Sequence, residues 1–290
     1  MSFSKISEIV KISEERKVPF WRIIIEDDMR DRNVSFEDSY AKMERMLDAM
    51  IQADKSYSPQ LRSNSGLSGG DGAKLEKFRK QENRLIGTFL TMVMEKAVKM
   101  GESNACMKRI VAAPTAGSCG VIPAVLLTYL EQKNPPKEKI IQSLYVAAGI
   151  GQVIAATASI SGAEGGCQAE IGSASAMAAG AVTFLEDGTT AQITTSVALA
   201  MKNMLGLTCD PVAGLVEVPC IKRNVSGAVN AIIASQMAIA GIESAIPADE
   251  VIESMGRIGQ LLPACLRETS QEGLAVTPTA LKVNKNLKNN

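Results

Sequence analysis

From residue 73 onward the chain consists of Ala-rich apolar segments separated by short Gly- and Pro-containing breaks. The breaks fall at residues 113–123, 133–137, 161–166, 210–219 and 246–248. Apolar residues between them recur at helical spacing, while the alternating patterns typical of strands are almost absent, with weak ones only near Ile23 and Val216. Aromatic residues make up only 4% of the chain, so Ala, Gly, Ser and Met must fill the interior. These features predict a mainly α fold with closely packed helices and Gly-rich loops.

Two helices and a loop are expected in the region before residue 73. An amphipathic helix is expected over residues 3–16 and is limited by Pro19, and a second helix is expected to begin near Ser35, where Ser35-x-x-Asp38 resembles a capping box. Residues 55–72 are rich in Ser and Gly and predict a loop. This loop is the best candidate for a boundary in the chain.

The boundary divides the sequence into three parts. Residues 1–60 form a small helical N-terminal part, and residues 61–281 form the main helical body, which opens with a long amphipathic stretch over 73–100. Residues 282–290 carry Lys and Asn but little apolar surface, which favours a flexible tail that is disordered or loosely docked.

Charge and segment composition exclude several classes of function. The 31 acidic and 31 basic residues balance, so neither nucleic acid nor an anionic membrane is an expected partner. The uncharged run from Ile140 to Ala163 is long enough to span a bilayer, but its many polar and small residues favour a buried helix pair in a soluble protein. The charged N-terminus lacks the apolar core of a secretory signal. We therefore expect a cytoplasmic protein, with its cysteines as thiols or metal ligands rather than disulfides.

The sequence contains no histidine. Histidine is the usual general base near neutral pH and the commonest ligand of catalytic zinc. Any metal chemistry must therefore use Cys, carboxylate or non-protein ligands, and a histidine base would have to come from another chain.

Three of the six cysteines lie in Gly- or Pro-rich loops. Cys167 follows three nearby glycines, and Cys209 and Cys220 flank a loop that holds two prolines. The glycines let the backbone approach a ligand and direct amide N–H groups toward it. The spacings match no zinc ribbon, thioredoxin or ferredoxin pattern, so these residues are either metal ligands or small buried hydrophobes. The other cysteines are interpreted as core residues: Cys106, Cys265 and, less typically, Cys119, which lies in a Gly-bracketed loop.

Two loops have the composition of anion sites. Residues 65–72 (SGLSGGDG) and 113–120 (APTAGSCG) each precede an expected helix, whose unpaired N–H groups suit a carboxylate or phosphate. Neither loop matches a nucleotide-binding motif. The alternative is an ordinary Gly-containing turn with a Ser or Thr cap.

Five segments together resemble the α subunit of bacterial iron–sulfur L-serine dehydratases. They are SGLSGGDGAKL, IVAAPTAGSCGVIPAVLL, SGAEGGCQAEIGSASAMAAG, LTCDPVAGLVEVPCIKRN and the closing LRET…GLAVTPT. The resemblance runs in order over almost the whole chain and is most specific over residues 161–224.

The resemblance implies a helical catalytic domain that holds a 4Fe-4S cluster through Cys167, Cys209 and Cys220. Three protein thiolates leave one iron open, which suits a Lewis acid that acts on the serine hydroxyl. The implied reaction is that of an L-serine ammonia-lyase, which yields pyruvate and ammonia in amino-acid degradation and gluconeogenesis. The substrate carboxylate is expected on the two glycine loops, at Ser68, Gly69, Gly70, Thr115 and Ser118.

The resemblance also implies a partner. Single-chain members of the family carry an additional domain that supplies a histidine, and its absence here matches the two-subunit form with a separate β subunit. The catalytic base is therefore unassigned in this chain and expected on the β subunit, with Glu164 and Lys222 as alternatives near the cysteine loops. A higher oligomer is expected. The sequence ends in Asn290, whereas some single-chain members end in a cysteine.

Two other interpretations remain. A pyridoxal-phosphate amino-acid dehydratase would need a Schiff-base lysine beside a phosphate-binding glycine loop in an α/β fold, and neither the lysine nor the strand pattern is evident. A non-catalytic scaffold subunit would use its cysteines as core residues. Iron and sulfide content distinguishes these cases from a cluster-bearing enzyme.

Overall fold

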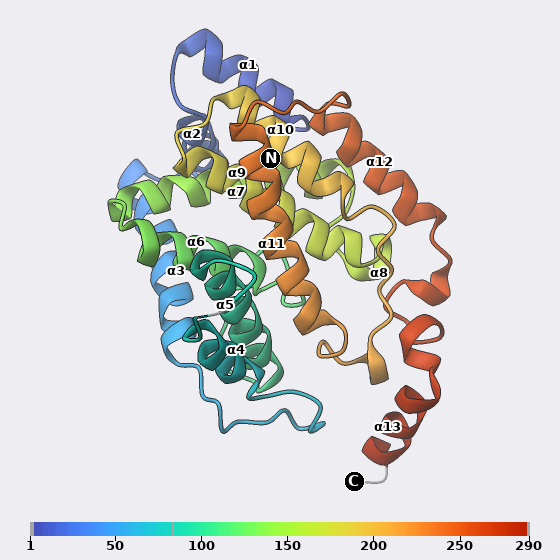
Figure 1. The fold of residues 1–290 in the computed structure, drawn as a ribbon. Helices are drawn as coiled ribbons and strands as arrows, with labels where there is room; N and C mark the ends of the chain where they lie inside the picture. Colours follow the sequence, from blue (N-terminus) through green and yellow to red (C-terminus); the bar gives the residue numbers. More distant parts are fainter. Residues whose placement is uncertain (1–2, 83, 289–290) are drawn as a thin grey trace.

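The computed structural model describes residues 3–82 and 84–288. These residues form α-helices and short turns without any β-strand; the one bridge of strand type joins Cys209 to Arg267 (Figure 1). The prediction of a mainly α fold is confirmed. The helices are α1 (Ile6–Arg16), α2 (Phe20–Arg32), α3 (Phe36–Lys55), α4 (Asp71–Arg79), α5 (Thr88–Ala105), α6 (Val121–Lys133), α7 (Lys137–Thr157), α8 (Gly162–Gly165), α9 (Ser173–Leu185), α10 (Thr190–Lys202), α11 (Cys220–Ile239), α12 (Ala248–Leu261) and α13 (Pro278–Lys288). Single turns are η1 (Gln168–Gly172), η2 (Val212–Gly214), η3 (Ala264–Leu266) and η4 (Gly273–Val276).

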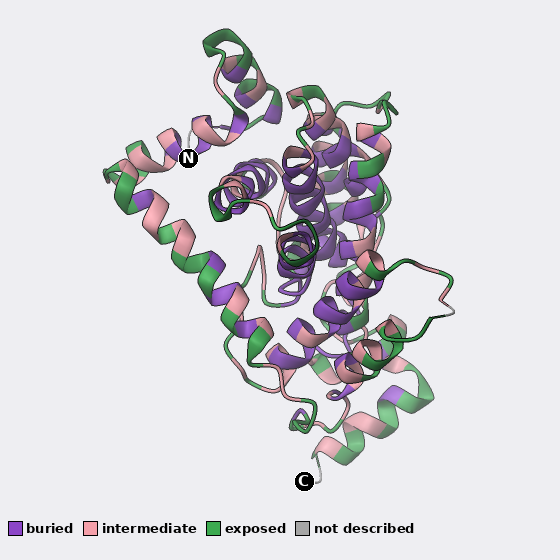
Figure 2. Ribbon diagram, turned by 60° about the vertical axis from the view of Figure 1, so that its left-hand side comes forward, coloured by how far each residue is buried: buried purple, intermediate pink, exposed green. Residues whose placement is uncertain are grey.

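Helix α9 lies at the centre and packs against α6, α7, α10 and α11. Of its residues, only Phe184 is not buried, and Figure 2 shows the central helices almost entirely in the colour of buried residues. Small side chains allow this close packing. A Cβ atom at Gly180 would lie 2.3 Å from Ile150 Cδ1, and one at Gly151 would lie 2.7 Å from Met177 Cε. The low aromatic content thus corresponds to a core built from closely approaching helices.

The N-terminal helices share this core. Helix α2 packs against α7, where a Cβ atom at Gly149 would lie 2.4 Å from Ile24 Cδ1. The connected set of buried apolar residues runs from Phe3 to Met255. The weak alternating pattern near Ile23 does not correspond to a strand, because this buried residue lies in α2. A helical element that buries several β-branched residues at once produces the same local pattern.

The run that is long enough to span a bilayer corresponds to one helix rather than a pair. Residues 140–157 all belong to α7, which could cross a membrane by length and composition alone. Its apolar window is 67% buried inside the structure, as in a core helix. The expectation of burial is confirmed, and that of two helices is wrong, since its internal glycines are accommodated without a break.

Two further helix predictions have different outcomes. The cap at Ser35 is confirmed, because the Asp38 N–H donates a hydrogen bond of 3.0 Å to Ser35 Oγ. The single stretch over 73–100 is wrong, since α4 ends at Arg79 and α5 begins at Thr88. Leu85 is fully exposed between them, so the apolar face is not continuous and no packing holds a helix there.

The C-terminal segment is helical in the structure. Residues 282–288 belong to α13, which begins at Pro278, a residue favoured in the first turn of a helix. Figure 1 shows α13 at the edge of the molecule, and its contacts are with η2 and η4. Residues 282–288 are therefore helical and docked at the edge of the molecule, one of the two alternatives expected for this tail, and residues 289–290 lie outside the described part of the chain.

Candidate metal centre

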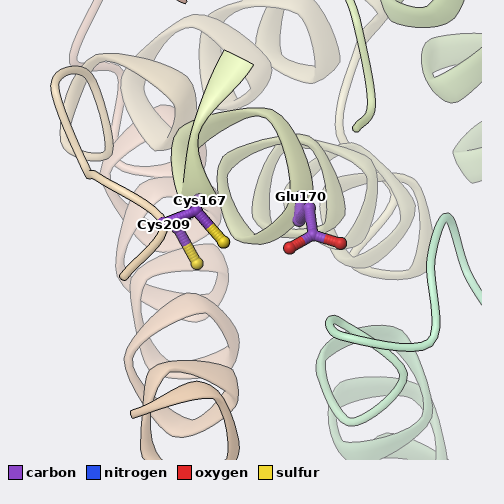
Figure 3. A group of neighbouring side chains, drawn as sticks. All are labelled: Cys167, Glu170 and Cys209. Atoms are coloured by element: carbon purple, nitrogen blue, oxygen red, sulfur yellow. The ribbon is translucent and has the colours of Figure 1, made fainter. Parts of the chain in front are cut away.

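Two predicted cysteine ligands and one carboxylate meet at the start of η1. The Sγ atoms of Cys167 and Cys209 and a carboxylate oxygen of Glu170 all lie within 4.8 Å of one another (Figure 3). Cys167 and Cys209 are only 1% and 2% exposed. Two thiols and a carboxylate in a nearly closed site are a donor set that can hold a metal ion.

The local backbone places Cys167 at this point. Gly166 has a φ of +74°, and a Cβ atom there would lie 2.8 Å from Leu207 O, so only glycine fits the close approach of the two segments. The Gln168 N–H donates to the same Leu207 O at 3.0 Å, and Gly206 N–H donates to Gln168 Oε1 at 2.8 Å. Residues 168–172 form a π-helical turn, a conformation common at functional sites.

Cys209 is fixed by the segment that follows α12. Its N–H donates to Leu266 O at 2.9 Å, and its carbonyl accepts from the Glu268 N–H at 2.7 Å. Glu268 has a φ of +64°, a strained value for a residue other than glycine. Two backbone hydrogen bonds from the LRET motif thus hold Cys209, which is far away in the sequence.

The hydrogen bond between the two thiols and a half-buried arginine make their pKa values unequal. The hydrogen bond from Cys209, and then the positive charge of Arg223, lower the pKa of the Cys167 thiol despite its burial. The same interaction with Cys167, followed by burial, raises the pKa of Cys209. Arg223 is anchored by Thr208 O at 2.7 Å and Asp210 Oδ1 at 3.0 Å. The two shifts run in opposite directions, so Cys167 is the more acidic thiol of the pair.

Cys220 lies outside the 4.8 Å group. It is buried at the first residue of α11, and Arg223 follows three residues later on the same face of that helix. Burial and the charges of Cys167 and Glu170 raise the pKa of the Cys220 thiol to about 12. Cys220 thus lies within electrostatic reach of the other two thiols, although the three do not form one closed set.

The remaining cysteines differ in burial. Cys119 is buried in the core as predicted, and burial raises its pKa to about 12. Cys106 and Cys265 are partly exposed, so their interpretation as core residues is wrong. Cys106 is the C-cap residue of α5, and Cys265 lies in the short turn η3. Solvent reaches the side chain at both positions.

A glycine leaves room beside the donors. A Cβ atom at Gly162 would lie 2.9 Å from Glu170 Oε2, 3.1 Å from Cys209 Sγ and 3.2 Å from Glu268 Oε2. Two carboxylates and a thiol from three segments therefore converge beside one Cα atom. Gly162 is one of the three glycines before Cys167, whereas Glu170 was not predicted, although it follows Cys167 by three residues, close to one helical turn.

The predicted substrate loop at 113–120 reaches this centre. Thr115 Oγ1 donates to Glu170 Oε1 at 2.8 Å, and the Ser118 N–H donates to Thr115 Oγ1 at 3.3 Å. Burial raises the pKa of Glu170, and the hydrogen bond from Thr115 opposes that shift. Asn224 Nδ2 donates to Gly117 O at 2.7 Å, which ties the loop to α11.

The second predicted loop already holds a carboxylate from the chain itself. The N–H groups of Asp71 and Gly72, at the start of α4, donate to Glu102 at 2.8 Å and 3.1 Å, and the Tyr57 hydroxyl donates to Glu102 at 2.7 Å. The N-terminus of α4 thus already binds the carboxylate of Glu102, an anion that the helix dipole favours there.

The residues just before that helix, Ser68 to Gly70, pack against an earlier part of the same loop. A Cβ atom at Gly69 would lie 2.2 Å from Leu61 O, and one at Gly70 would lie 3.0 Å from the Arg62 guanidinium. Ser68 is buried, and its N–H donates to Ser63 Oγ at 3.2 Å. The two glycines therefore allow the loop to double back closely over residues 61–62.

The two alternative bases lie away from the donor group. Glu164 is exposed and accepts a hydrogen bond from Ser159 Oγ at 2.7 Å. Lys222 Nζ lies 2.7 Å from Asp71 Oδ2, which links the start of α11 to the start of α4. Neither side chain is part of the group formed by Cys167, Cys209 and Glu170.

Comparison with known proteins gives consistent matches. The family model described as serine dehydratase alpha chain matches residues 15–275. The chain is 46% identical over 285 residues to the probable L-serine dehydratase, alpha chain, of Bacillus subtilis (strain 168), which covers 98% of this chain and 95% of that protein. It is 38% identical over 279 residues to the L-serine dehydratase, alpha chain, of Peptoniphilus asaccharolyticus, covering 96% of each. A match to the L-serine dehydratase of Haemophilus influenzae is 47% identical over 182 residues, 62% of this chain but only 40% of that protein.

Proposed function

This chain belongs to the serine dehydratase α-chain family, and from that premise we propose that it is the cluster-carrying subunit of an enzyme that converts L-serine into pyruvate and ammonia. The observation that carries the proposal is the candidate metal-ligating group of Cys167, Cys209 and Glu170, whose donor atoms lie within 4.8 Å of one another. Two relatives that match over nearly the whole chain are named for this reaction. The proposed enzyme is a carbon–nitrogen lyase of the cytoplasm.

We propose that Cys167, Cys209 and Cys220 hold a 4Fe-4S cluster. The donor chemistry fits, because thiolates are the usual ligands of such clusters and Arg223 already favours the thiolate of Cys167. The space fits as well, since Gly162 keeps the region beside Cys209 free of a side chain. When bound through three cysteines, the cluster supplies a Lewis-acidic iron for the hydroxyl of the substrate.

The residues of this chain then bind and orient the substrate. Thr115, Ser118 and the Ser68–Gly70 loop are proposed to contact L-serine, with its carboxylate toward their hydroxyl and amide groups. Thr115 supports this role best, because its hydroxyl already bonds Glu170 beside the thiols. Ser118 is fully buried and bonded to Thr115, so it also fixes the conformation of the loop.

The base that removes the α-proton is proposed to lie on a β subunit. This chain has no histidine, and two of its relatives are named as alpha chains, which implies a partner chain for them. The enzyme is proposed to be a higher oligomer of both subunits.

One experiment separates the proposal from its two rivals. The chain is purified without oxygen, analysed for iron and sulfide, reconstituted with its β subunit and assayed for pyruvate from L-serine. Iron, sulfide and turnover together support the proposal. A borohydride-sensitive visible band without iron would indicate pyridoxal phosphate instead, and a colourless, inactive complex would indicate a scaffold.

A further inference from the structure

A buried carboxylate connects the loop before α4 with the segment between two of the proposed ligands. Glu217 is only 6% exposed. Its oxygens accept hydrogen bonds from Ser63 Oγ at 2.7 Å and from Ser65 Oγ at 2.8 Å. Among the ion pairs of the described residues, none involves Glu217, so hydroxyl groups rather than a cation compensate its burial. A charge buried in this way is costly unless its hydrogen bonds are complete.

The two serines that bond Glu217 also hydrogen-bond the backbone of their own loop. Ser63 Oγ accepts from the Ser68 N–H at 3.2 Å, and Ser65 Oγ accepts from the Leu67 N–H at 3.1 Å. The Ser63 N–H in turn donates to Ser68 O at 3.0 Å. Because each hydroxyl gives its proton to Glu217, its lone pairs remain available to these amides. The carboxylate thus determines the loop conformation that leads into Gly69 and Gly70.

On its other side, Glu217 belongs to the segment between Cys209 and Cys220. Its carbonyl accepts from the Ile221 N–H at 3.0 Å in the first turn of α11, one residue beyond Cys220. The Val212 N–H donates to Val218 O at 2.9 Å, which closes this segment toward Cys209. The backbone of residue 217 is therefore tied to the segments of both cysteines, and these backbone bonds do not involve the carboxylate.

We propose that Glu217 is a positioning residue that holds the Ser63–Gly70 loop in register with the segment that carries Cys209 and Cys220. The inference rests on the proposed function, because the loop matters for catalysis only if Ser68, Gly69 and Gly70 contact L-serine. The Lys222–Asp71 ion pair links the same two regions, but it is exposed and contributes little. The buried Glu217 contacts therefore set the distance between the substrate loop and the proposed cluster.

The chain offers matched variants for a test. Glu217→Ala removes the acceptor of both hydroxyls, whereas Glu217→Gln keeps one carbonyl acceptor and should have an intermediate effect. Ser58→Ala is the control, because Ser58 also lies in the segment between α3 and α4 but outside the Ser63–Gly70 loop, and its hydroxyl bonds the exposed Gln60 side chain at 3.0 Å.

The measurement is hydrogen–deuterium exchange of the reconstituted α/β holoenzyme, combined with iron content and steady-state kinetics. In Glu217→Ala, the Leu67 and Ser68 amides should exchange about tenfold faster, and KM for L-serine should rise about tenfold, as for the loss of one charged hydrogen bond. The value of kcat should fall less than KM rises, and iron content should stay at the wild-type level. Ser58→Ala should match wild type in every measurement.

Several outcomes would overturn the proposal. Unchanged exchange at Leu67 and Ser68 in a folded, iron-replete Glu217→Ala enzyme would show that Glu217 does not hold the loop. Faster exchange with unchanged KM would show that the loop does not position serine. Should Glu217→Ala fail to fold, Ser65→Ala replaces it, with faster exchange expected at Leu67 and a raised KM, and wild-type values there contradicting the proposal. A wild-type complex without pyruvate production would refute the proposed function instead, and the exchange data would still decide the role of Glu217 in the loop.

Discussion

Thr115 Oγ1 donates a hydrogen bond of 2.8 Å to Glu170 Oε1, and this contact ties the loop before α6 to the turn that begins at Cys167. The two residues are 55 positions apart in the sequence. A glycine loop that was predicted for its amide groups thus reaches the centre through a side chain. The hydroxyl of its threonine, rather than an amide at the helix N-terminus, makes this contact.

This contact predicts a graded effect of substitutions at Thr115. Thr115→Val removes the hydroxyl but keeps the shape, so kcat/KM for L-serine should fall about tenfold through the loss of one charge-assisted hydrogen bond. Thr115→Ser should keep most of the activity. Thr194→Val is the control, because that hydroxyl bonds only a backbone carbonyl in α10. Equal kinetics of Thr115→Val and wild type would remove Thr115 from the site.

The proposed ligands predict a division among the cysteines. Replacement of Cys167, Cys209 or Cys220 by Ser should abolish iron binding and serine turnover, because a serine hydroxyl is not ionised at neutral pH. Cys106→Ser and Cys265→Ser should lower the free energy of unfolding by about 1 kcal/mol or less, since both side chains are partly exposed. Iron and sulfide content of anaerobically purified variants is the measurement. Full iron content in Cys220→Ser would exclude it as a ligand, which is the sharpest test because Cys220 lies outside the closed group.

Gly162 predicts a steric effect on the same centre. In Gly162→Ala, the new Cβ atom would lie 2.9 Å from Glu170 Oε2 and 3.1 Å from Cys209 Sγ, so the donors must move apart or the space must close. Iron content should fall several-fold. Gly87→Ala is the matched control, because a Cβ atom there meets nothing within 4 Å. Wild-type iron content in both variants would mean that the space beside Gly162 is not used.

Much of the architecture could be predicted from the sequence, because helical periodicity and Gly/Pro breaks are local signals. Ser35 capped its helix as expected, since a capping residue acts within one turn. The break at residues 80–87 could not be found in this way, because it depends on Leu85 having no packing partner in three dimensions. Glu170 was missed for a similar reason. Its importance comes from Thr115 and Cys209, which reach it from distant segments.

The Asp28–Arg32 pair in α2 predicts a pH dependence of stability. The hydrogen bond from Arg32, supported by one from Ser39, lowers the pKa of Asp28 below its usual value, although partial burial opposes this. Because the folded pKa is lower than the unfolded pKa of about 3.9, the pair stabilises the fold above that pH, and this contribution is lost as pH falls through the folded pKa.

Asp28→Asn should therefore lower the free energy of unfolding at pH 7 by about 0.5–1 kcal/mol, a value reduced by solvent screening at a partly exposed site. At about pH 3.5, below the unfolded pKa of about 3.9, the difference from wild type should be smaller, because the contribution is lost as pH falls through the lowered folded pKa. Urea unfolding followed by circular dichroism at both pH values measures it. Asp187→Asn, whose side chain is 84% exposed, should change little at either pH. A difference that grows as pH falls would contradict the assigned direction of the shift.

The absence of histidine predicts that this chain is inactive without its partner. The proposed reaction removes an α-proton near neutral pH, and a base works best when its pKa is close to that pH. Unperturbed carboxylates and lysines titrate well away from it. The structure leaves the two alternative bases poorly placed, because Lys222 is paired with Asp71 and Glu164 is exposed outside the donor group. We therefore expect no pyruvate from cluster-loaded α chain alone and rapid turnover once the β subunit is added. Glu164→Gln and Lys222→Met in the α/β complex should keep most of the activity. Turnover by the α chain alone at the rate of the complex would refute the need for a partner, and loss of activity in either variant would place the base in this chain.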